Sequence, residues 1–371
     1  MATSPTSQNT SVSEFVCECA DLFRSACTAE PFYKERNGKR YCVLHYPSVQ
    51  KISDFQDTFK RKLHRKDFDF RGVWFPSNPE FFEFEFSEKA DFIGATFSVH
   101  AEFYRATFRA GAYFSEATFV DGANFTQTAF NAGANFGWAI FRGETAFDYA
   151  EFSGEVDFTE ASFNAAVVFF GATFKDHVRF AGGVKKHPTF VISLDLQFAR
   201  IEVPDHFSFH TLTARPPWFI NVDARKFDFS NVDWYWRTTK EEIRTLQQND
   251  ISSPHRLLAI ACRQLAVNAE ENHRYEEASK FRYMAMDARR LEHWRGFDFR
   301  RLSWWYWLAS GYGERVWQAG VVLVCILLFC AALFTRVGFT RWEPRVTNQS
   351  EAATAQRDEV GAPFKFTKAL T

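Results

Sequence analysis

The sequence lacks the common signatures of catalysis. Its 371 residues contain no Walker loop, no dinucleotide-binding glycine motif, no nucleophile elbow and no HExxH helix. The ten histidines are scattered, and the carboxylates fall at exposed positions of the pattern without forming an evident desolvated pair. We therefore expect a protein that is not an enzyme.

A secretory signal is also missing, because the first 45 residues contain no long apolar run. The seven cysteines cluster near the N-terminus or lie scattered, and they do not form the even framework of a disulfide-stapled domain. Both absences favour a reducing, cytoplasmic compartment for most of the chain.

Net charge is nearly absent, at −1, but this value hides an asymmetry. Residues 68–177 contain 16 acidic and six basic residues, whereas residues 274–345 are basic and rich in Trp. The first of these segments is therefore expected to present an acidic surface.

Residues 68–177 consist of ten copies of one eleven-residue unit, such as AEFYRATFRAG at 101–111. The third and eighth residues of every unit are Phe, and from Ala90 onward the residue two before each Phe is small. In a helix these positions would be spread around the axis and would not form one apolar face, which argues against a helix. In an extended chain residues two apart point the same way, so the small residue and Phe share an inner side.

The Phe-to-Phe spacing alternates between five and six, so four steps make 22 residues. If each step is one side of a square coil, Phe92 and Phe114 begin one internal ladder and Phe103 and Phe125 begin another. Successive coils would stack at about 4.8 Å. The predicted structural core is Phe92, Phe97, Phe103, Phe108, Phe114, Phe119, Phe125, Phe130, Phe136, Phe141, Phe147, Phe152, Phe158 and Phe163.

This pattern, A-x-F followed by two or three free residues, resembles the bacterial pentapeptide-repeat family in its Phe-centred form. The resemblance implies a mainly β fold, a right-handed quadrilateral β-helix with about 22 residues per coil, over residues 68–180. The sixth residue in every second step departs from the family's simplest members and is expected to enlarge two of the four corners.

After Phe180 the pattern fails, and we expect an insertion loop at 181–195. Two or three irregular closing coils are expected over 196–237, with Phe198, Val203 and Phe209 resuming the five-and-six spacing. The segment FINVDARKFDFSNVDW (219–234) resembles the closing coil of the same family.

Residues 1–15 are expected to be disordered, and residues 16–47 form a small Cys/His module. Thiolate and imidazole ligands in its C-x-C…C…C-x-x-H array suit a tetrahedral, structural zinc site. The preferred ligands are Cys19, Cys27, Cys42 and His45, with Cys17 as the alternative first ligand. The competing interpretation is a short cap with buried free thiols. The string YCVLHYP also resembles the Cys/His module that precedes the coil in some pentapeptide-repeat proteins.

Helices are expected on both sides of the coil. Residues 48–67 have apolar residues at helical spacing, at Ile52, Phe55, Phe59 and Leu63. This spacing predicts an amphipathic helix that caps the first coil. Residues 238–296 read as a helical hairpin, with a capping box at Thr239 and Glu242 and a second start at Ser253-Pro254. We interpret this hairpin as a cap on the coil in preference to a partner-binding groove.

Residues 316–334 carry no charge, lie between Arg315 and Arg336 and follow an aromatic segment at 302–312 that includes Trp304, Trp305 and Trp307. These features predict an interfacial segment followed by one transmembrane helix; the alternative is a buried core helix. The excess of Arg on the N-terminal side places the N-terminal bulk inside, at a single-pass position in the cell inner membrane. Residues 335–371 read as a polar tail, and SGYGER (310–315) resembles the membrane-associated branch of the family.

Together these features predict a non-enzymatic, membrane-anchored scaffold that presents an acidic β-helical surface to a protein partner, with homo-oligomers also compatible. Nucleic acid is not an expected partner. One alternative is a DNA mimic that binds a topoisomerase, because some pentapeptide-repeat proteins resemble a DNA duplex in width and charge. Another is the cytoplasmic regulatory part of a channel or sensor, which would need oligomers because one helix cannot line a pore.

Overall fold

The computed structural model describes residues 15–27, 30–183, 193–292, 302–313 and 316–337. It divides the chain into two units, residues 1–293 and 294–371, which are described separately below. The segments 1–14 and 338–371, and most of the predicted insertion loop, lie outside the described residues.

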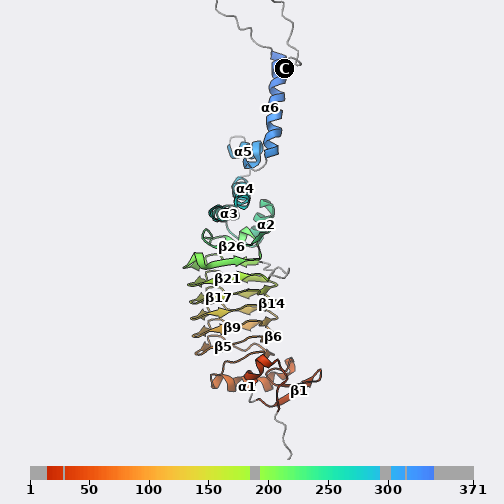
Figure 1. Ribbon diagram of the computed structural model, residues 1–371, viewed down its shortest axis with the longest axis vertical. Helices are drawn as coiled ribbons and strands as arrows, with labels where there is room; N and C mark the ends of the chain where they lie inside the picture. Colours follow the sequence, from red (N-terminus) through yellow and green to blue (C-terminus); the bar gives the residue numbers. More distant parts are fainter. Residues whose placement is uncertain (1–14, 28–29, 184–192, 293–301, 314–315, 338–371) are drawn as a thin grey trace, which may run out of the picture. The chain divides into compact units, whose positions relative to one another are not determined.

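The first unit contains four parallel β-sheets whose strands recur every 22 residues in the regular part, which confirms the predicted coil (Figure 1). One sheet holds β3 (Trp74–Phe75), β6 (Thr96–Phe97), β10 (Thr118–Phe119), β14 (Ile140–Phe141) and β18 (Ser162–Phe163). A second holds β4 (Glu85–Phe86), β8 (Thr107–Phe108), β12 (Ala129–Phe130), β16 (Glu151–Phe152), β20 (Thr173–Phe174) and β23 (Arg200–Ile201).

The third sheet is the longest, with β5 (Ala90–Asp91), β9 (Ala112–Tyr113), β13 (Ala134–Asn135), β17 (Val156–Asp157), β21 (Val178–Ala181), β24 (Phe207–His210) and β26 (Asp228–Ser230). The fourth holds β7 (Ala101–Glu102), β11 (Ala123–Asn124), β15 (Thr145–Ala146), β19 (Ala166–Val168) and β22 (Ser193–Asp195). A final short pair joins β25 (Thr213–Ala214) to β27 (Asp233–Trp234).

Stacked Phe rings fill the interior. Phe92 and Phe114 have ring centroids 4.8 Å apart and nearly parallel planes, and Phe103 and Phe125 repeat this geometry at 4.8 Å on another side. Rings on different sides meet edge to face, as Phe92 and Phe103 do. All fourteen predicted core rings are buried. Because strand spacing and ring stacking coincide, each coil continues the core of the one before it.

The corners between the sides are tight turns. The amide of Ala106 donates to the carbonyl of Phe103, and between them Arg105 has a φ of 56°. The same left-handed position returns every eleven residues, usually without glycine, at Glu116, Gln127, Trp138, Tyr149 and Glu160. A positive φ at the third residue is what a type II turn requires. The backbone amide of each corner residue also donates to a carbonyl of the next coil, as Arg105 does to Thr126 at 3.0 Å.

The coils after Phe180 differ from the prediction in two ways. Residues 193–195, expected in the insertion loop, already form β22, which pairs with β19. Phe198 was expected to face inward, but it is 59% exposed and occupies a corner at φ 59°. The strand register shows why: Asp195 pairs with Val168, so buried Leu196 succeeds Phe169 in the ladder. Phe209 does face inward and stacks on Phe180 at 5.3 Å.

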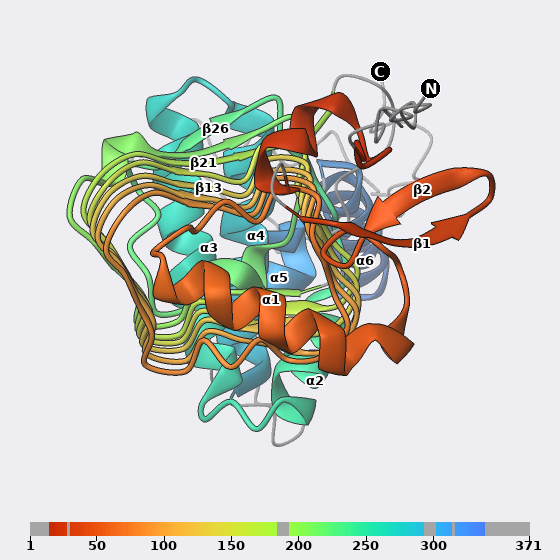
Figure 2. The same ribbon diagram turned by 90° about the horizontal axis from the view of Figure 1, so that it is seen from below.

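The N-terminal end of the coil is covered by α1 (Ile52–His64), which crosses it in Figure 2. It follows η1 (Asp21–Cys27), the antiparallel pair β1 (Phe32–Arg36) and β2 (Lys39–Cys42), and η2 (Val49–Lys51). Phe55 and Phe59 pack on Phe75 at 5.6 and 5.9 Å. Ile52, predicted to face the coil, is exposed instead. The buried face is Phe55, Thr58, Phe59 and Lys62, which is itself a helical stripe.

Three helices follow the coil: α2 (Thr239–Gln248), α3 (Pro254–Glu271) and α4 (Tyr275–Glu292). The short turns η3 (Pro204–His206) and η4 (Pro216–Phe219) precede them. The capping box of α2 is formed by Thr238 and Glu241, one residue before the predicted pair, because Glu242 is buried against Arg215 at 2.5 Å. Ser253 adopts a left-handed conformation and makes no side-chain cap.

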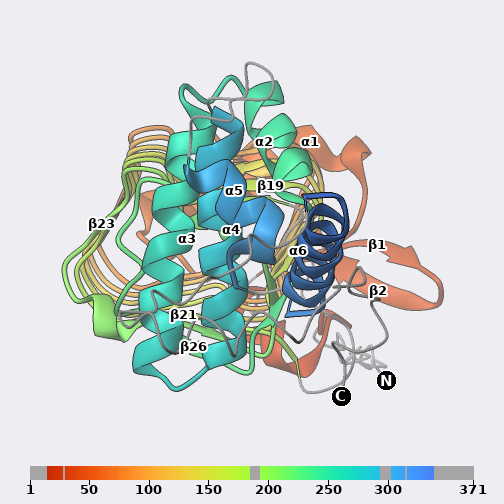
Figure 3. The same cartoon turned by 90° about the horizontal axis from the view of Figure 1, so that it is seen from above.

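The hairpin of α3 and α4 covers the last coil (Figure 3). The amide of Asn268 donates to the backbone carbonyls of Ala224, Arg225 and Phe227 at 3.3, 2.9 and 2.7 Å. Trp234, at the end of the coil, packs edge to face on Phe281 at 4.8 Å. The hairpin thereby supplies a hydrogen-bond donor to the open backbone of the final coil and covers its apolar surface.

The second unit contains α5 (Leu302–Ser310), η5 (Gly311–Gly313) and α6 (Val316–Val337). Residues Trp317–Arg336 form a helix long and apolar enough to cross a membrane, with a mean hydropathy of 2.4 and none of it buried. The amide of Gln318 donates to the carbonyls of Trp307 and Leu308 at 3.3 and 2.8 Å, which ties α6 to the end of α5. The side chain of Trp304 lies outside the described part.

Replacing Phe136 by Ala should lower the free energy of unfolding by about 3–5 kcal/mol, because it leaves a cavity between two stacked rings. Denaturant unfolding of the full chain in detergent measures this. Phe82→Ala is the matched control, since it removes the same ring from a position that is 53% exposed; its cost should stay below about 1 kcal/mol. Equal losses in both variants would contradict the proposed role of the ladder.

Replacing Asn268 by Ala should cost about 1–3 kcal/mol, because three carbonyls of the closing coil lose their shared donor. Hydrogen exchange should show faster opening at 224–234 while the coils around Phe125 stay protected. Asn249→Ala, an exposed residue at the end of α2, should change neither quantity. Unchanged exchange at 224–234 in the Asn268 variant would show that the hairpin does not hold the coil end.

Candidate metal centre

Four metal-ligating side chains converge at the N-terminal end of the first unit. Cys17 precedes η1, Cys27 ends η1, Cys42 ends β2, and His45 lies in the turn that follows. One ligand atom from each lies within 4.8 Å of all the others, and all four residues are buried. This cluster can hold a metal ion.

The donor atoms are already near a coordinating arrangement. The Cys42 sulfur lies 3.2 Å and the Cys17 sulfur 3.9 Å from Nδ1 of His45. A tetrahedral zinc ion with Zn–S bonds of about 2.3 Å holds two sulfurs about 3.8 Å apart. The four groups therefore need to move little to enclose an ion.

The tautomer of His45 is set by the coil. Its Nε2 lies 2.9 Å from the carbonyl of Arg71, which can only accept, so Nε2 carries the proton and donates. Nδ1 then points into the cluster and can offer its lone pair to an ion once it releases its own proton, an arrangement typical of histidine ligands. Burial disfavours protonation of His45, but hydrogen bonds with Cys17 and Cys42 outweigh it and raise its pKa to about 9.

The thiols share protons unequally. Hydrogen bonds from Cys19, Cys27 and Cys42 hold the pKa of Cys17 far below its usual range, so this sulfur is the thiolate of the group. The corresponding bond to Cys17 raises the pKa of Cys27. A buried thiolate beside a polar imidazole is a strong ligand for a soft metal ion.

The cluster is fastened to the coil on several sides. The carbonyl of Leu44, between two ligands, accepts from the amide of Trp74 at 3.0 Å. The buried ammonium of Lys51 donates to the carbonyls of Val43 and Leu44 at 2.6 and 2.8 Å. Burial lowers the pKa of Lys51 to about 7. The turn from Cys42 to His45 is therefore held before any ion binds.

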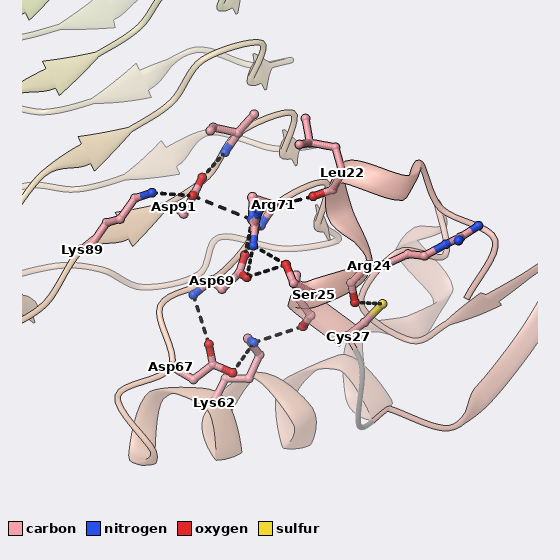
Figure 4. Close-up of polar contacts among 12 residues, drawn as sticks. Leu22, Arg24, Ser25, Cys27, Lys62, Asp67, Asp69, Arg71, Lys89 and Asp91 are labelled. Carbon is pink, nitrogen blue, oxygen red and sulfur yellow. Dashed lines mark hydrogen bonds and ion pairs between the residues drawn. The ribbon is translucent and has the colours of Figure 1, made fainter. Parts of the chain in front are cut away.

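A polar network joins η1 to the first coil (Figure 4). The guanidinium of Arg71 binds Asp69 at 2.7 Å, donates to the hydroxyl of Ser25 and donates to the carbonyl of Leu22. Lys62 of α1 donates to the carbonyl of Ala26 and pairs with Asp67 at 2.5 Å. These contacts hold the segment between Cys17 and Cys27 against the coil.

Phe23 of η1 adds an apolar contact over two corner glycines. A Cβ atom at Gly94 would lie 2.4 Å from the Phe23 ring, and one at Gly72 would lie 2.3 Å from it. Only glycine leaves room for this ring. The Cys/His module thus closes one corner of the first coils as well as their end.

The structure corrects the preferred ligand set at one position, because the group contains Cys17 in place of Cys19. The amide of Cys42 donates to the Cys17 sulfur at 3.3 Å, and Glu18 pairs with the backbone of Arg40, so Cys17 lies beside β2. Cys19 is half-buried, and its sulfur reaches the Cys17 carbonyl at 3.9 Å. The C-x-C spacing contains no signal that separates the two.

A second group, Asp176, His177 and His206, is also brought together by the coil. This group could not be predicted from the sequence, because His177 and His206 are 29 positions apart across the break in the repeat and each looks like an isolated surface histidine.

Comparison with known families supports the repeat assignment. Residues 81–128 and 103–151 match the family model described as pentapeptide repeats (9 copies). The match covers the part of the coil in which the Phe ladders are most regular. No curated protein and no solved structure matches the chain.

Proposed function

We propose that this chain, whose coil is a β-helix of the pentapeptide-repeat family, is a membrane-anchored scaffold that binds a protein partner through the outer surface of the coil. The observation that carries the proposal is the contrast between the two sides of the coil wall. The interior is filled by Phe rings, while large aromatic side chains also stand exposed at the corners. Only the outer surface is available for recognition.

Three exposed aromatics occupy corners of the coil: Trp138, Tyr149 and Phe198, which are 53%, 56% and 59% exposed. Tyr149 contacts Phe170 at 5.6 Å, and Phe170 contacts Phe198 at 5.3 Å, so these three rings form one continuous edge, whereas Trp138 lies half a coil away in the other line of corners. Each corner residue has a left-handed backbone fixed by the turn. Rigid, exposed aromatic side chains of this kind are enriched in protein interfaces.

The charge pattern favours a scaffold over a DNA mimic. Arg105 pairs with Glu83, Arg109 with Glu85, and Lys175 with Glu151, each across adjacent coils. These ion pairs place cations within the acidic surface. A duplex mimic needs a continuous negative field, whereas a protein-binding surface benefits from alternating charge that fixes register.

The second unit supports attachment to a membrane. In its described part, the candidate span Trp317–Arg336 has no buried residue, as expected for a helix that lipid would surround. Trp305 and Tyr306 of α5 are half-exposed just before it, as expected for side chains at the lipid interface. The Arg residues of 289–301 lie on the N-terminal side of the span. Because Arg and Lys are enriched on the cytoplasmic side of a membrane, we expect the coil to lie at the cytoplasmic face of the inner membrane.

The metal of the Cys/His cluster is proposed to be zinc in a structural role. Three sulfurs and one imidazole nitrogen complete a tetrahedron, which leaves no coordination position for a substrate. The ion would hold η1, β2 and the His45 turn together and so keep the first coil covered.

The purified full chain should retain one equivalent of zinc after dialysis against a weak chelator. Cys17→Ser and Cys42→Ser should lose most of it, because each removes a thiolate from the group of four. Elemental analysis measures the content. Cys19→Ser is the matched control and should keep its zinc; loss in that variant with retention in Cys17→Ser would overturn the ligand set.

The full chain should sediment with membranes, whereas a chain ending at residue 301 should be released, and fractionation with blotting tests this. A double variant, Tyr149→Ala with Phe198→Ala, should remain in the membrane but lose the proteins that cross-link to the wild type, because it removes both exposed ends of the continuous edge. Asn131→Ala with Asn164→Ala, which alters exposed polar positions of the same coils, should keep them. Identical cross-linked partners in both variants would exclude this surface.

A further inference from the structure

We propose that Asp176, His177 and His206 form a second metal site, on the outer surface of the coil, which binds a late first-row transition-metal ion. The site is separate from the Cys/His cluster, and it does not depend on the scaffold function proposed above. Three observations support it: strand register, side-chain geometry and local charge.

The strand register brings the two histidines together. His177 directly precedes β21 and His206 directly precedes β24. The first residues of these strands, Val178 and Phe207, are parallel partners. The two histidines therefore occupy equivalent positions on adjacent coils. Each lies in the longer type of corner, where consecutive inward-facing rings are six residues apart or more. Their rings stack with centroids 3.7 Å apart and planes 15° apart.

Asp176 supplies the third donor. Its Oδ1 lies 2.7 Å from Nδ1 of His177, and one ligand atom of each of the three residues lies within 4.8 Å of the other two. The hydrogen bond with His177 also lowers the pKa of Asp176, which keeps the carboxylate charged. Two imidazoles and one carboxylate suit Zn²⁺, Ni²⁺ or Cu²⁺ better than Mg²⁺ or Ca²⁺, which prefer oxygen ligands.

Among the residues that the structure describes, three neighbouring cations pair with other carboxylates. Lys175 binds Glu151, Arg179 approaches Glu155 at 4.0 Å, and Lys226 approaches Asp205 at 3.9 Å. Asp176 is left to the two imidazoles, so the corner attracts a cation.

The side chains can adjust to coordinate an ion. Stacked parallel rings direct their lone pairs alongside each other, so both rings must rotate about Cβ–Cγ to point at one metal. His177 and Asp176 are about half exposed, with side-chain values of 54% and 46%, and His206 is exposed. Rotation about this bond is soft in exposed histidines. Three protein donors would leave at least one position for water or for a residue of another protein.

The test is calorimetric titration of Ni²⁺ into the full chain in detergent, without a histidine tag. The Cys/His cluster is first loaded with one equivalent of zinc, and dialysis against a weak chelator then removes any zinc from the weaker surface site. The wild type should bind one equivalent of Ni²⁺. His206→Ala should bind at least tenfold more weakly, and Asp176→Asn should also be weaker. His210→Ala removes a histidine from β24, the strand that follows His206, but outside the group, and should match the wild type.

Cobalt distinguishes the two sites spectroscopically. Added to the zinc-loaded chain, Co²⁺ should bind without a thiolate-to-metal charge-transfer band, because this site has only nitrogen and oxygen donors. The proposal fails if the zinc-loaded wild type takes up no Ni²⁺, if His206→Ala and His210→Ala weaken binding equally, or if the added Co²⁺ shows the thiolate band.

Discussion

The structure depends on the match between the spacing of adjacent β-strands and the stacking distance of Phe rings. Parallel strands lie about 4.8 Å apart, and aromatic rings associate at centroid distances of about 4.5–7 Å. The ladders fall within both limits, with Phe119 and Phe141 at 4.7 Å and Phe136 and Phe158 at 5.0 Å. One translation along the axis therefore satisfies the backbone hydrogen bonds and the core together. Small residues before each Phe leave the room that the adjacent rings need.

A core built in this way has no natural end, so both ends require other structures. At the N-terminal end, Phe55 and Phe59 of α1 continue the aromatic packing onto Phe75. At the C-terminal end, Trp234 and Phe281 continue it into the hairpin, while Asn268 satisfies backbone carbonyls that no further coil can pair. The Cys/His cluster belongs to the same solution, since His45 bonds to the first coil through the Arg71 carbonyl. The cluster would link separate segments at this end of the coil, which agrees with a structural role for the proposed zinc.

The regular coil could be predicted from the sequence because the same eleven-residue pattern recurs along it. Each Phe has the same neighbours, so one unit determines the rest. Prediction was wrong where the repeat breaks or where two residues are equivalent locally. Phe198 looked like the next inward ring, but the register set by β19 gives that place to Leu196. Cys17 and Cys19 were equivalent by spacing, and they are separated by the contacts of Glu18 with Arg40 and of Cys17 with the Cys42 amide. The capping box was misplaced by one residue because burial of Glu242 outweighed its capping potential.

The same register that builds the core also arranges the surface. Any two residues one coil apart are held at strand spacing on a rigid wall, so chance polar residues become pairs with fixed geometry. Several such pairs are ion pairs, as in Arg109 with Glu85 and Lys175 with Glu151. Where both residues are imidazoles, at His177 and His206, the pair becomes a chelate. The break in the repeat changes the separation from 22 to 29 residues, and this shift brings these two histidines into register. A disruption of the sequence pattern can thus create a site that the uninterrupted repeat would not contain.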